Sequence, residues 1–477
     1  MRAPTHILTP DLCIVGAGSG GLSVAAGAAQ MGASVVLVEA GEMGGDCLNF
    51  GCVPSKALIA AARRAHEIRE APGFGVSAAA PQIDYAAVMA HVRATIAGIA
   101  PHDSQERFEG LGVTVIREVA RFVSPEEIAA GSQRIRPRRV VIATGSTPAV
   151  PPIPGLSHVP YLTNETLWSN ETLPGHLLVL GGGPIGIEMA AAHRRLGARV
   201  TVIEADRALG REDPEMAGIV LDQLRAEGVA IRDGAAAHEI QGRAGAIRVT
   251  LADGSVHEGT HLLVATGRRP SVERLDLDAG GIAHDASGIR VNRGLRSVTN
   301  ARVYAIGDVT GGLQFTHVAG YQAGLVVRSA LFRLPVRYDA RAIPRVTFTD
   351  PEIAHVGLTE AEARADLGRK VEVHRFAFAE NDRARAERRT EGAAKLVACS
   401  KGHIHGVTIV GAQAGELVSL WALALSQRLK IKDVAGHVAP YPTLSEVNKR
   451  LAGAYFAPRL FQSAGVKKIV RLLARLG

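Results

Sequence analysis

Short hydrophobic runs that end in glycine turns recur along the chain. Four such runs form two pairs. In each pair, a glycine turn and a stretch of helix-forming residues separate the first hydrophobic run from the second. Short apolar runs bounded by glycine are typical of buried strands, and their alternation with helices predicts parallel sheets of the α/β class. The four runs are residues 11–15, 34–38, 177–180 and 199–203.

The glycine turns have the pattern of dinucleotide-binding units. They read GAGSGG from Gly16 and GGGPIG from Gly181. An acidic residue, Glu39 or Glu204, lies 23 residues after the first glycine of each turn. In such units the glycines let the backbone approach a pyrophosphate at a helix N-terminus, and the acid binds a ribose hydroxyl. Two copies at the same spacing predict that the chain binds two dinucleotides.

Each half closes with a similar predicted strand, VVIATG at residues 140–145 and LLVATG at residues 262–267. The ATG triplets begin 127 and 84 residues after the first glycine of their half, so the first half is longer by about 43 residues. We expect the excess to follow Glu39, where two cysteines lie. The proline-rich stretch 147–155 predicts a linker between the halves.

Length, composition and charge narrow the class of protein. The 477 residues allow about three domains of roughly 150 residues. The net charge of +8 is spread along the chain, which favours a solvated surface and no nucleic-acid partner. Neither a signal peptide before Asp11 nor an apolar run of about 18 residues is visible, so we expect a cytoplasmic protein.

Two of the four cysteines, Cys47 and Cys52, lie close together in the segment GGDCLNFGCVPSK, whereas Cys13 and Cys399 stand alone. A zinc site would need a second pair, and a secreted disulfide scaffold would be shorter and richer in cysteine. Pro54 suits the first turn of a helix, which places Cys52 near a helix N-terminus that favours a thiolate. The pattern indicates a redox pair; the alternative is two buried small hydrophobic residues.

The segment 44–56 resembles the redox-active signature of the flavoprotein disulfide reductases, which include dihydrolipoamide dehydrogenase, glutathione reductase and mercuric reductase. The resemblance runs from about Asp11 to about Tyr455 and includes residues 186–188, 305–308, 348–352 and 356–359. It implies an α/β fold with two Rossmann-type domains, an α+β dimerisation domain and a homodimer. The implied boundaries are 1–155 for the FAD domain, 156–275 for the NAD(P) domain, 276–340 for a segment completing the FAD domain, 341–457 for the dimerisation domain and 458–477 for a tail.

The resemblance also implies the cofactors and the residues that hold them. For FAD these residues are Gly16, Gly18, Gly21, Glu39, Gly45, Lys56, Thr144, Gly145, Gly307 and Asp308. For the nicotinamide nucleotide they are Gly181, Gly183, Gly186, Glu204 and Gly267. The carboxylate of Glu204 favours the 2′-hydroxyl of NADH, and Arg207 nearby leaves NADPH as the alternative.

The implied reaction passes electrons from NADH through FAD to a Cys47–Cys52 disulfide. Cys52 faces the flavin, and Cys47, further out, attacks or binds the substrate. Lys56 and Glu188 are the implied ion pair beside the flavin. The implied catalytic set is Cys47, Cys52, Lys56, Glu188, Tyr441 and Glu446.

The chain departs from the disulfide-reducing members at Tyr441. Their H-P-T-x-S-E motif supplies a histidine that acts as acid and base, whereas residues 441–446 read YPTLSE. A phenol with a pKa of ~10 is a poor base near neutral pH, where imidazole at ~6.5 is suited to proton transfer. His437 is an alternative base. Mercuric reductases also carry tyrosine here, which favours a thiophilic metal ion or another electrophile as the electron acceptor.

Two alternatives for the reaction stay open. Mercuric reductases end in a cysteine pair, and many begin with a metal-binding domain; with no cysteine after Cys399 and no such motif at the start of the given sequence, we expect mercury reduction to be inefficient. The first alternative is a dihydrolipoamide dehydrogenase-like disulfide reductase with an atypical tyrosine. The second is a membrane-surface NADH:quinone oxidoreductase in which the cysteines no longer act. Two dinucleotide sites make a non-catalytic flavin-binding module a weaker explanation.

The tail, VKKIVRLLARL at residues 466–476, predicts a basic amphipathic helix. At about 100° per residue, six apolar residues fall on one face and four basic residues on the other. The apolar residues are Val466, Ile469, Val470, Leu472, Leu473 and Leu476, and the basic ones are Lys467, Lys468, Arg471 and Arg475. Such a helix either lies on an anionic membrane surface, which would place the protein at the membrane periphery, or packs on its own dimer.

Overall fold

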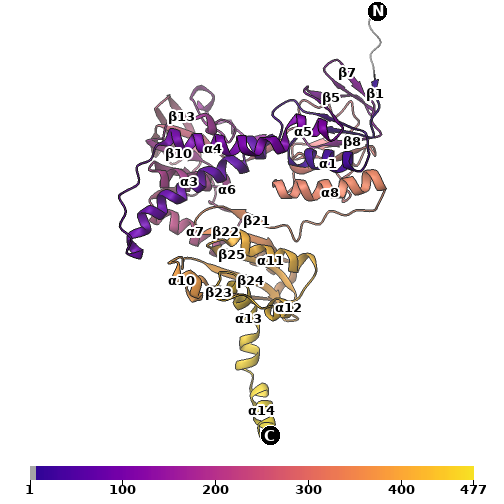
Figure 1. Ribbon diagram of the computed structural model, residues 1–477. Coiled ribbons are helices and arrows are strands. Elements are labelled where there is room, and N and C mark those ends of the chain that lie inside the picture. Colours follow the sequence, from indigo (N-terminus) through magenta and orange to yellow (C-terminus); the bar gives the residue numbers. More distant parts are fainter. Residues whose placement is uncertain (1–6, 477) are drawn as a thin grey trace, which may run out of the picture. The chain divides into compact units, whose positions relative to one another are not determined.

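The computed structural model describes residues 7–476, which form two compact units (Figure 1). The first unit comprises residues 7–182, Ala192–Ala205 and Ala235–Asp339, and the second comprises Gly183–Ala191, Asp206–Gly234 and 340–476. Both glycine turns begin in the first unit. The domain boundaries implied by the resemblance stay a prediction.

A five-stranded parallel sheet lies at the centre of the first unit. Its strands, in spatial order, are β20 (Val303–Ala305), β8 (Arg139–Ile142), β2 (Leu12–Val15), β3 (Val35–Val38) and β4 (Val113–Ile116). Val15 pairs with Val38 on one side and with Ile142 on the other, so these strands end at the same edge. Parallel sheets of this kind bind their ligands beyond the carboxyl ends of the strands.

Both faces of this sheet are covered. Helices α1 (Ser19–Gln30) and α8 (Thr316–Phe332) lie side by side and share a hydrophobic core with one face (Figure 1). The other face packs on a second sheet through Phe122, Ile128 and Ile135. The strands of that sheet, in order, are β1 (Ile7–Leu8), β7 (Gln133–Ile135), β6 (Glu127–Ala130) and β5 (Ala120–Ser124). Burial on both faces explains why the central strands are apolar throughout.

The extra length of the first half lies where the sequence predicted it. Between β3 and β4 the described chain forms the helices α2 (Gly45–Asn49), α3 (Cys52–Glu70), α4 (Tyr85–Ile99) and α5 (Gln105–Gly110). At the corresponding place in the second half, the chain has α7 (Pro214–Ala226) before β12 (Val229–Arg232). Both cysteines of the pair belong to this insertion.

The second half repeats the strand pattern of the first. Its parallel strands are β11 (Arg199–Ile203), β10 (His176–Leu180) and β16 (His261–Val264), and α6 (Pro184–Leu196) follows β10. An antiparallel sheet packs on them and consists of β13 (Ala237–Arg243), β14 (Ala246–Leu251) and β15 (Val256–Gly259). The elements beginning with β2 and β10 therefore confirm the predicted internal repeat.

Two short strand pairs complete the first unit. They are β9 (Ser146–Pro148) with β17 (Arg268–Pro270), and β18 (His284–Asp285) with β19 (Gly288–Ile289). The prediction of a plain linker over residues 147–155 is wrong at its start. Thr147 and Pro148 are held in β9 by antiparallel pairing with Arg269 and Arg268, and this pairing brings the end of the second half close to the first.

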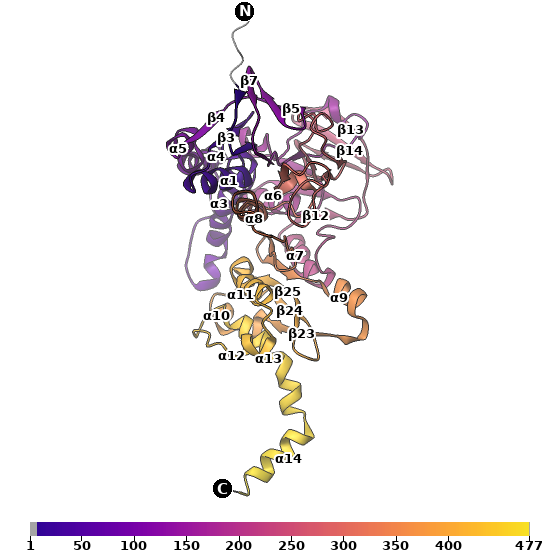
Figure 2. The same ribbon diagram turned by 90° about the vertical axis from the view of Figure 1, so that its right-hand side faces the viewer.

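The second unit contains a five-stranded antiparallel sheet with helices around it (Figure 2). Its strands, in order, are β21 (Arg345–Thr347), β22 (Glu352–Gly357), β25 (Ile404–Gly411), β24 (Ala393–Cys399) and β23 (Val371–Ala377). The helices are α9 (Glu360–Leu367), α10 (Asp382–Ala386), α11 (Ala414–Ser426), α12 (Ile431–Gly436) and α13 (Glu446–Phe461). Fully buried Trp421 donates a hydrogen bond of 2.8 Å to Asn448 and joins α11 to α13. This unit has the expected α+β architecture.

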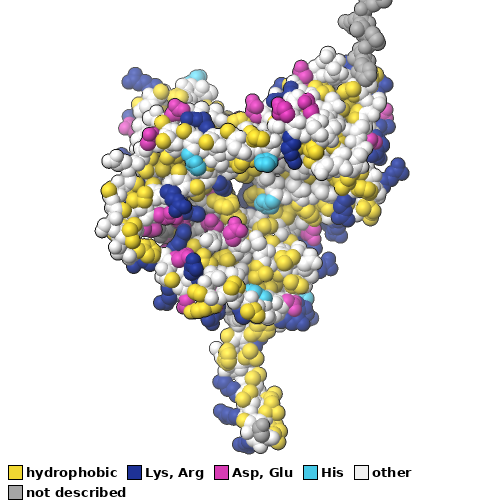
Figure 3. All heavy atoms as spheres, in the orientation of Figure 1, with side chains coloured by type: hydrophobic (Ala, Val, Ile, Leu, Met, Phe, Trp, Pro, Cys, Tyr) yellow, Lys and Arg dark blue, Asp and Glu magenta, His cyan; other side chains and the backbone are white. Residues whose placement is uncertain are grey.

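Helix α14 (Ala464–Leu473) follows α13 and confirms that the tail is helical. None of its residues is buried, and Figure 3 shows hydrophobic and basic side chains along its length. Ser463 caps its N-terminus by accepting a hydrogen bond from the backbone of Val466. Among residues 7–476, no helix has both the length and the apolar character needed to cross a membrane.

Candidate redox site

Glycines place the cysteine helices against the first glycine turn. Gly44 and Gly45 have positive φ angles of 88° and 59°, a conformation that residues with a Cβ rarely adopt. A Cβ on Gly45 would lie 2.7 Å from the Cα of Gly18 in the turn. The absence of side chains here lets α2, which carries Cys47, lie directly on the loop predicted to bind FAD.

The two thiols differ strongly in acidity. Cys47 and Cys52 are free. The interaction with the Cys47 thiol lowers the pKa of Cys52 to about 6, and Thr316 and the charge of Lys56 contribute in the same direction. The same interaction, together with burial, raises the pKa of Cys47. Cys52 is therefore the thiolate of the pair, and Cys47 holds the proton.

Three helices begin beside this pair. Cys52 is the first residue of α3, Ser19 is the first of α1 and Thr316 is the first of α8. Thr316 and Ser19 both act to lower the pKa of Cys47, and the Oγ1 atom of Thr316 lies 3.4 Å from the Sγ atom of Cys52. The N-terminal ends of helices carry partial positive charge, so this convergence favours a negative sulfur.

The two cysteines differ in solvent exposure. Cys52 is exposed, whereas Cys47 is only partly exposed. Cys52 is the first residue of α3, whereas Cys47 lies within α2. The assignment of Cys47 as the thiol that meets the substrate stays a prediction.

The loop around the cysteines is anchored by residues from distant segments. Asp46 accepts a hydrogen bond of 3.0 Å from Asn164 and pairs with Arg268 at 3.1 Å. Trp168 donates a hydrogen bond of 2.9 Å to the backbone oxygen of Phe50. None of these partners was predicted from the sequence, because no motif connects them to the cysteine segment.

Arg268 also connects this loop to Asp308, one of the predicted FAD residues. Its Nε donates a hydrogen bond of 2.7 Å to the hydroxyl of Ser146, and that hydroxyl donates one of 2.5 Å to Asp308. Burial raises the pKa of Asp308. The guanidinium lies within 3.9 Å of the Asp308 carboxylate. One cation, whose side chain is 10% exposed, therefore holds both Asp46, next to Cys47, and Asp308 in place.

The first glycine turn fits a dinucleotide. Gly16 has a φ of 104°, and a Cβ there would lie 2.4 Å from the oxygen of Ala143. Gly21 lacks room for a side chain because its Cβ would lie 1.8 Å from the oxygen of Gly16. The carboxylate of Glu39 accepts hydrogen bonds from the backbone N–H groups of Ala17 and Gly41. The acid thus reaches the turn, where a ribose would meet it.

Other predicted FAD residues surround the same edge of the sheet. Thr144 donates a hydrogen bond of 2.8 Å to Ser271, and Gly145 has a φ of 68°. Gly307 donates its N–H to Gln322 on α8 over 2.7 Å. Gly307 and Asp308 follow β20 after one residue, Ile306, and β20 pairs with β8 in the central sheet. The structure therefore brings these residues into the unit that contains Gly16.

The second glycine turn has matching geometry. Gly181 also has a φ of 104°, and its Cβ would lie 2.4 Å from the oxygen of Ala265. Glu204 accepts a hydrogen bond of 2.6 Å from Gly182, the counterpart of the Glu39–Ala17 bond. A side chain on Gly183 would meet open space, and Gly267 has a φ of 138°. The turn therefore has the shape of a second nucleotide site.

The remaining residues of the predicted sites belong to the second unit. Glu188 is buried and accepts a hydrogen bond of 2.9 Å from the backbone of Phe348. Gly186 lies in the part of α6 assigned to the same unit. Lys56 belongs to the first unit, so the Lys56–Glu188 ion pair stays a prediction.

Tyr441 lies in an exposed polar environment. Its side chain is 69% exposed, and its hydroxyl donates a hydrogen bond of 3.1 Å to Asp382 at the start of α10. This bond and the nearby charges of Asp382 and Glu446 raise the pKa of Tyr441. Glu446, the first residue of α13, is partly buried. His437 instead donates from Nδ1 to the oxygen of Val434.

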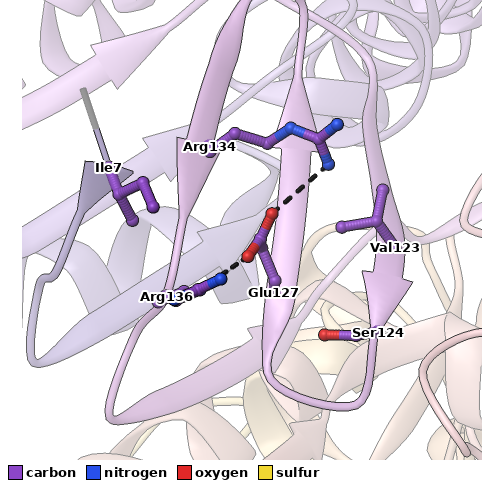
Figure 4. A pocket seen from close by; sticks show the side chains of 6 residues that line it. All are labelled: Ile7, Val123, Ser124, Glu127, Arg134 and Arg136. Atoms are coloured by element: carbon purple, nitrogen blue, oxygen red, sulfur yellow. Dashed lines mark hydrogen bonds and ion pairs between the residues drawn. The ribbon is translucent and has the colours of Figure 1, made fainter. Parts of the chain in front are cut away.

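A shallow hollow of about 570 Å³ lies away from the cysteines, on the sheet formed by β1, β7, β6 and β5 (Figure 4). Glu127 crosses it and pairs with both Arg134 and Arg136, at 3.3 and 2.6 Å. These charges largely satisfy one another, so the hollow has no strong attraction for an ionic ligand. In the described part of the chain, no group of three or more His, Cys, Asp or Glu residues could hold a metal ion.

Known proteins share this arrangement. The family model of pyridine nucleotide-disulphide oxidoreductases matches residues 10–323, and the model of the family's dimerisation domain matches residues 343–452. The mercuric reductase of Acidithiobacillus ferrooxidans is 34% identical over 93% of this chain and 82% of its own length. The dihydrolipoyl dehydrogenase of Thermus scotoductus is 36% identical over 92% of this chain and 95% of its own length.

A solved structure agrees with these relatives. The Cu(II) complex of RclA, a HOCl-induced flavoprotein disulfide reductase from Escherichia coli, superposes with a TM-score of 0.84. It is 27% identical and covers 93% of this chain and 99% of its own. The dimerisation domain supports a homodimer, and family members use FAD and NAD(P)H. The chain belongs to the pyridine nucleotide-disulphide oxidoreductases and is a redox enzyme of that family.

Proposed function

We propose that the protein reduces a thiophilic metal ion with electrons from NADH, by way of FAD and the Cys47–Cys52 pair. The observation that carries this proposal is Tyr441. At the position where disulfide-reducing members have a histidine, the chain has an exposed phenol bound to Asp382. Its raised pKa leaves even less of the phenolate at neutral pH, which supports an acceptor that, unlike a disulfide, needs no proton transfer from this position.

The chain's own residues have separate tasks in this reaction. When bound, FAD would supply two-electron transfer between NADH and the cysteine pair. Gly16, Gly21 and Glu39 fit the first nucleotide, and Gly181 and Glu204 fit the second. Two electrons and one proton, which together make up the hydride of NADH, would break the Cys47–Cys52 disulfide and leave the thiolate of Cys52 and the thiol of Cys47. With Hg(II) as the metal ion, the overall balance is NADH plus Hg(II) giving NAD⁺, a proton and Hg(0).

The dithiol suits a soft metal ion. Thiolates are the ligands that soft ions prefer, and Cys52, with a pKa of about 6, is already deprotonated at neutral pH. Binding of the metal would displace the proton of Cys47 as a second thiolate forms. Two relatives favour this chemistry: one is a mercuric reductase, and the other was solved as a Cu(II) complex. Reducing cytoplasm is the compartment in which both thiols would stay available.

The second candidate function is reduction of a small disulfide. It is favoured by the dihydrolipoyl dehydrogenase of Thermus scotoductus, which is 36% identical to this chain. Glu446 stands at the family spacing for a histidine partner, but the histidine position holds Tyr441. Without an imidazole the rate with disulfides should be lower by about 10²–10⁴ than with one.

Steady-state turnover with Hg(II), Cu(II), lipoamide and glutathione disulfide tests the proposal. We expect NADH-dependent reduction of a metal ion and slow turnover of both disulfides. Cys52→Ser should abolish metal reduction while FAD stays bound and NADH still reduces it. Cys13→Ser is the matched control, because Cys13 is fully buried in β2, away from the pair. Fast lipoamide turnover without metal reduction would overturn the proposal in favour of the second candidate.

A further inference from the structure

Helix α14 exposes an apolar face that nothing in its own unit covers. The exposed fractions of Ile469, Val470, Leu472 and Leu473 lie between 57% and 59%, and that of Leu476 is 78%. An amphipathic helix on the surface of a globular protein normally turns its apolar stripe toward the core. Here that stripe faces solvent from Ile469 to Leu473, which indicates a surface for a partner.

The apolar surface begins before α14. Leu460 and Phe461, at the end of α13, are 47% and 73% exposed. In Figure 3 the yellow hydrophobic side chains continue from this region along the terminal helix. The helix boundary at Ser463 therefore does not interrupt the apolar surface, and the partner must be able to contact both helices.

The charge of α14 indicates what the partner is. Residues 464–476 contain four cationic side chains and no acidic residue. The cations gather on the face opposite the apolar stripe, as the helical geometry requires at about 100° per residue. A helix with a basic face and an aliphatic face of this kind lies in the interface of a membrane that contains anionic lipids.

A second copy of α14 is a poorer fit. Helix pairs in water are usually matched by opposite charges beside the apolar seam. Two copies of α14 would bring together eight cations with no acid on either helix to offset them, if each contributes its four. An anionic lipid surface offers both apolar chains and compensating charge.

We propose that α14, together with Leu460 and Phe461, anchors the protein to the surface of a membrane containing anionic phospholipids. The helix lies parallel to the surface with its aliphatic side chains among the lipid chains. Its Lys and Arg side chains reach the phosphates from the other face. This inference does not depend on which electron acceptor the enzyme uses.

Co-sedimentation of the full-length FAD-loaded protein with vesicles tests the anchor. Vesicles of phosphatidylcholine and phosphatidylglycerol should carry the protein down at low salt, and vesicles of phosphatidylcholine alone should not. Replacing the four basic residues of α14 by Gln should weaken binding at least about tenfold. The replaced residues are Lys467, Lys468, Arg471 and Arg475. The double variant Leu472→Gln, Leu473→Gln should lose binding although it keeps all four charges.

A matched control removes the same charge elsewhere in the second unit. The control variant replaces four exposed basic residues of this unit by Gln: Arg369, Lys370, Lys401 and Lys432. This control should bind phosphatidylglycerol vesicles like the wild type, and all variants should keep NADH oxidation with a soluble dye. If the control loses binding as strongly as the α14 variant, the attraction is only a general charge effect and the proposal is wrong.

Hydrogen exchange separates the membrane from a protein partner. Without vesicles the amides of residues 464–473 should exchange fast, and anionic vesicles should slow them. Slow exchange without vesicles that persists at every protein concentration would show that the helix packs on its own subunit. Slow exchange that appears only on dimer formation would identify a second copy. Either result would overturn the proposal.

Discussion

The Sγ atom of Cys52 lies 3.4 Å from the Oγ1 atom of Thr316, although 264 residues separate them along the chain. The contact joins the N-terminus of α3 to the N-terminus of α8. A hydroxyl that donates to a thiolate stabilises the charged form, and Thr316 lowers the pKa of Cys52 in this way. Thr316, which comes from the segment 276–340, therefore takes part in setting the pKa of the redox pair.

Thr316→Val should raise the pKa of Cys52, by about one unit or less, because the thiolate loses a hydroxyl donor. In the wild type the thiolate is present above a pH of about 6 and is lost as the pH falls through that value. The rate of alkylation of the reduced protein by iodoacetamide should follow this titration. Thr316→Ser keeps the hydroxyl and should leave the profile unchanged. An identical profile for the Val variant would show that the threonine does not donate to Cys52.

Arg268 should act on Cys52 through Asp46. The carboxylate of Asp46 raises the pKa of Cys52, and the guanidinium of Arg268 lies 3.1 Å from that carboxylate. Arg268→Gln should therefore raise the pKa of Cys52, by about one unit or less, and Asp46→Asn should lower it. In the double variant the effect of Arg268→Gln should largely vanish. The pH profiles of alkylation measure the pKa of Cys52 in the two single variants and the double variant. If the pKa shifts of the single variants simply add in the double variant, Arg268 does not act through Asp46.

The internal repeat could be predicted from the sequence because the residues that indicate it lie close together along the chain. Gly16 and Gly181 need positive φ angles and close contact with the ATG segments, so only glycine fits at both places. Glu39 and Glu204 end hydrophobic strands, and each bonds to the backbone of its own turn. Pro54 correctly indicated a helix start near Cys52.

The partners of the cysteines could not be predicted in this way. Thr316, Asn164 and Arg268 reach the site from distant segments, and each is a single polar residue without periodicity or spacing. Their roles depend on how β17, α8 and the cysteine helices pack, which is decided by tertiary contacts. Asp382 could not be predicted either, because no sequence motif indicates its hydrogen bond with Tyr441.

Glu204 should set the preference for NADH over NADPH. Its carboxylate accepts a bond of 2.6 Å from Gly182 and would repel a 2′-phosphate. Glu204→Gln keeps an acceptor for Gly182 but removes the charge. The kcat/KM for NADH divided by the kcat/KM for NADPH should therefore fall about tenfold, or about 1.4 kcal/mol. Arg207→Gln is the companion variant and should weaken NADPH more than NADH if Arg207 reaches that phosphate. A wild-type preference for NADPH would contradict the assignment.

Lys395 should contribute strongly to the stability of the second unit. Its side chain is 3% exposed, and its Nζ lies 2.7–2.8 Å from the carboxylates of Asp213, Glu215 and Glu360. Lys395→Met leaves these acids without their shared cation and should cost about 3 kcal/mol, seen as a lower urea midpoint. Lys401→Met, at an exposed site, is the control and should change little.

The stability that is lost in Lys395→Met should also depend on pH. The pKa of Glu215 is lowered to about 2, first by its bond to Arg375 and then by Lys395. A carboxyl group with a lowered pKa stabilises the fold above its ordinary value of 4.5, and this contribution is lost as the pH falls toward 2. The difference between wild type and Lys395→Met should therefore be constant near neutral pH and shrink below a pH of about 4.5. A difference that grows in acid would contradict the ion-pair explanation.

Tyr441 should decide between a metal ion and a disulfide as the electron acceptor. Tyr441→His introduces an imidazole with an ordinary pKa of ~6.5 near Asp382 and Glu446, the two acids that already act on the phenol. Lipoamide turnover should rise by at least about tenfold, a part of the 10²–10⁴ that acid–base help provides. Reduction of FAD by NADH should not change, because no disulfide proton is moved in that step.

Tyr441→Phe completes this test because it removes only the hydroxyl that donates to Asp382. We expect it to lower the turnover of Hg(II) or Cu(II), since the phenol oxygen would no longer be available to the metal, and to leave the slow lipoamide rate as it is. Steady-state assays of the three proteins with each acceptor give the comparison. If the wild type already reduces lipoamide fast and His437→Gln stops it, His437 is the base despite its bond to Val434, and Tyr441 does not exclude disulfides.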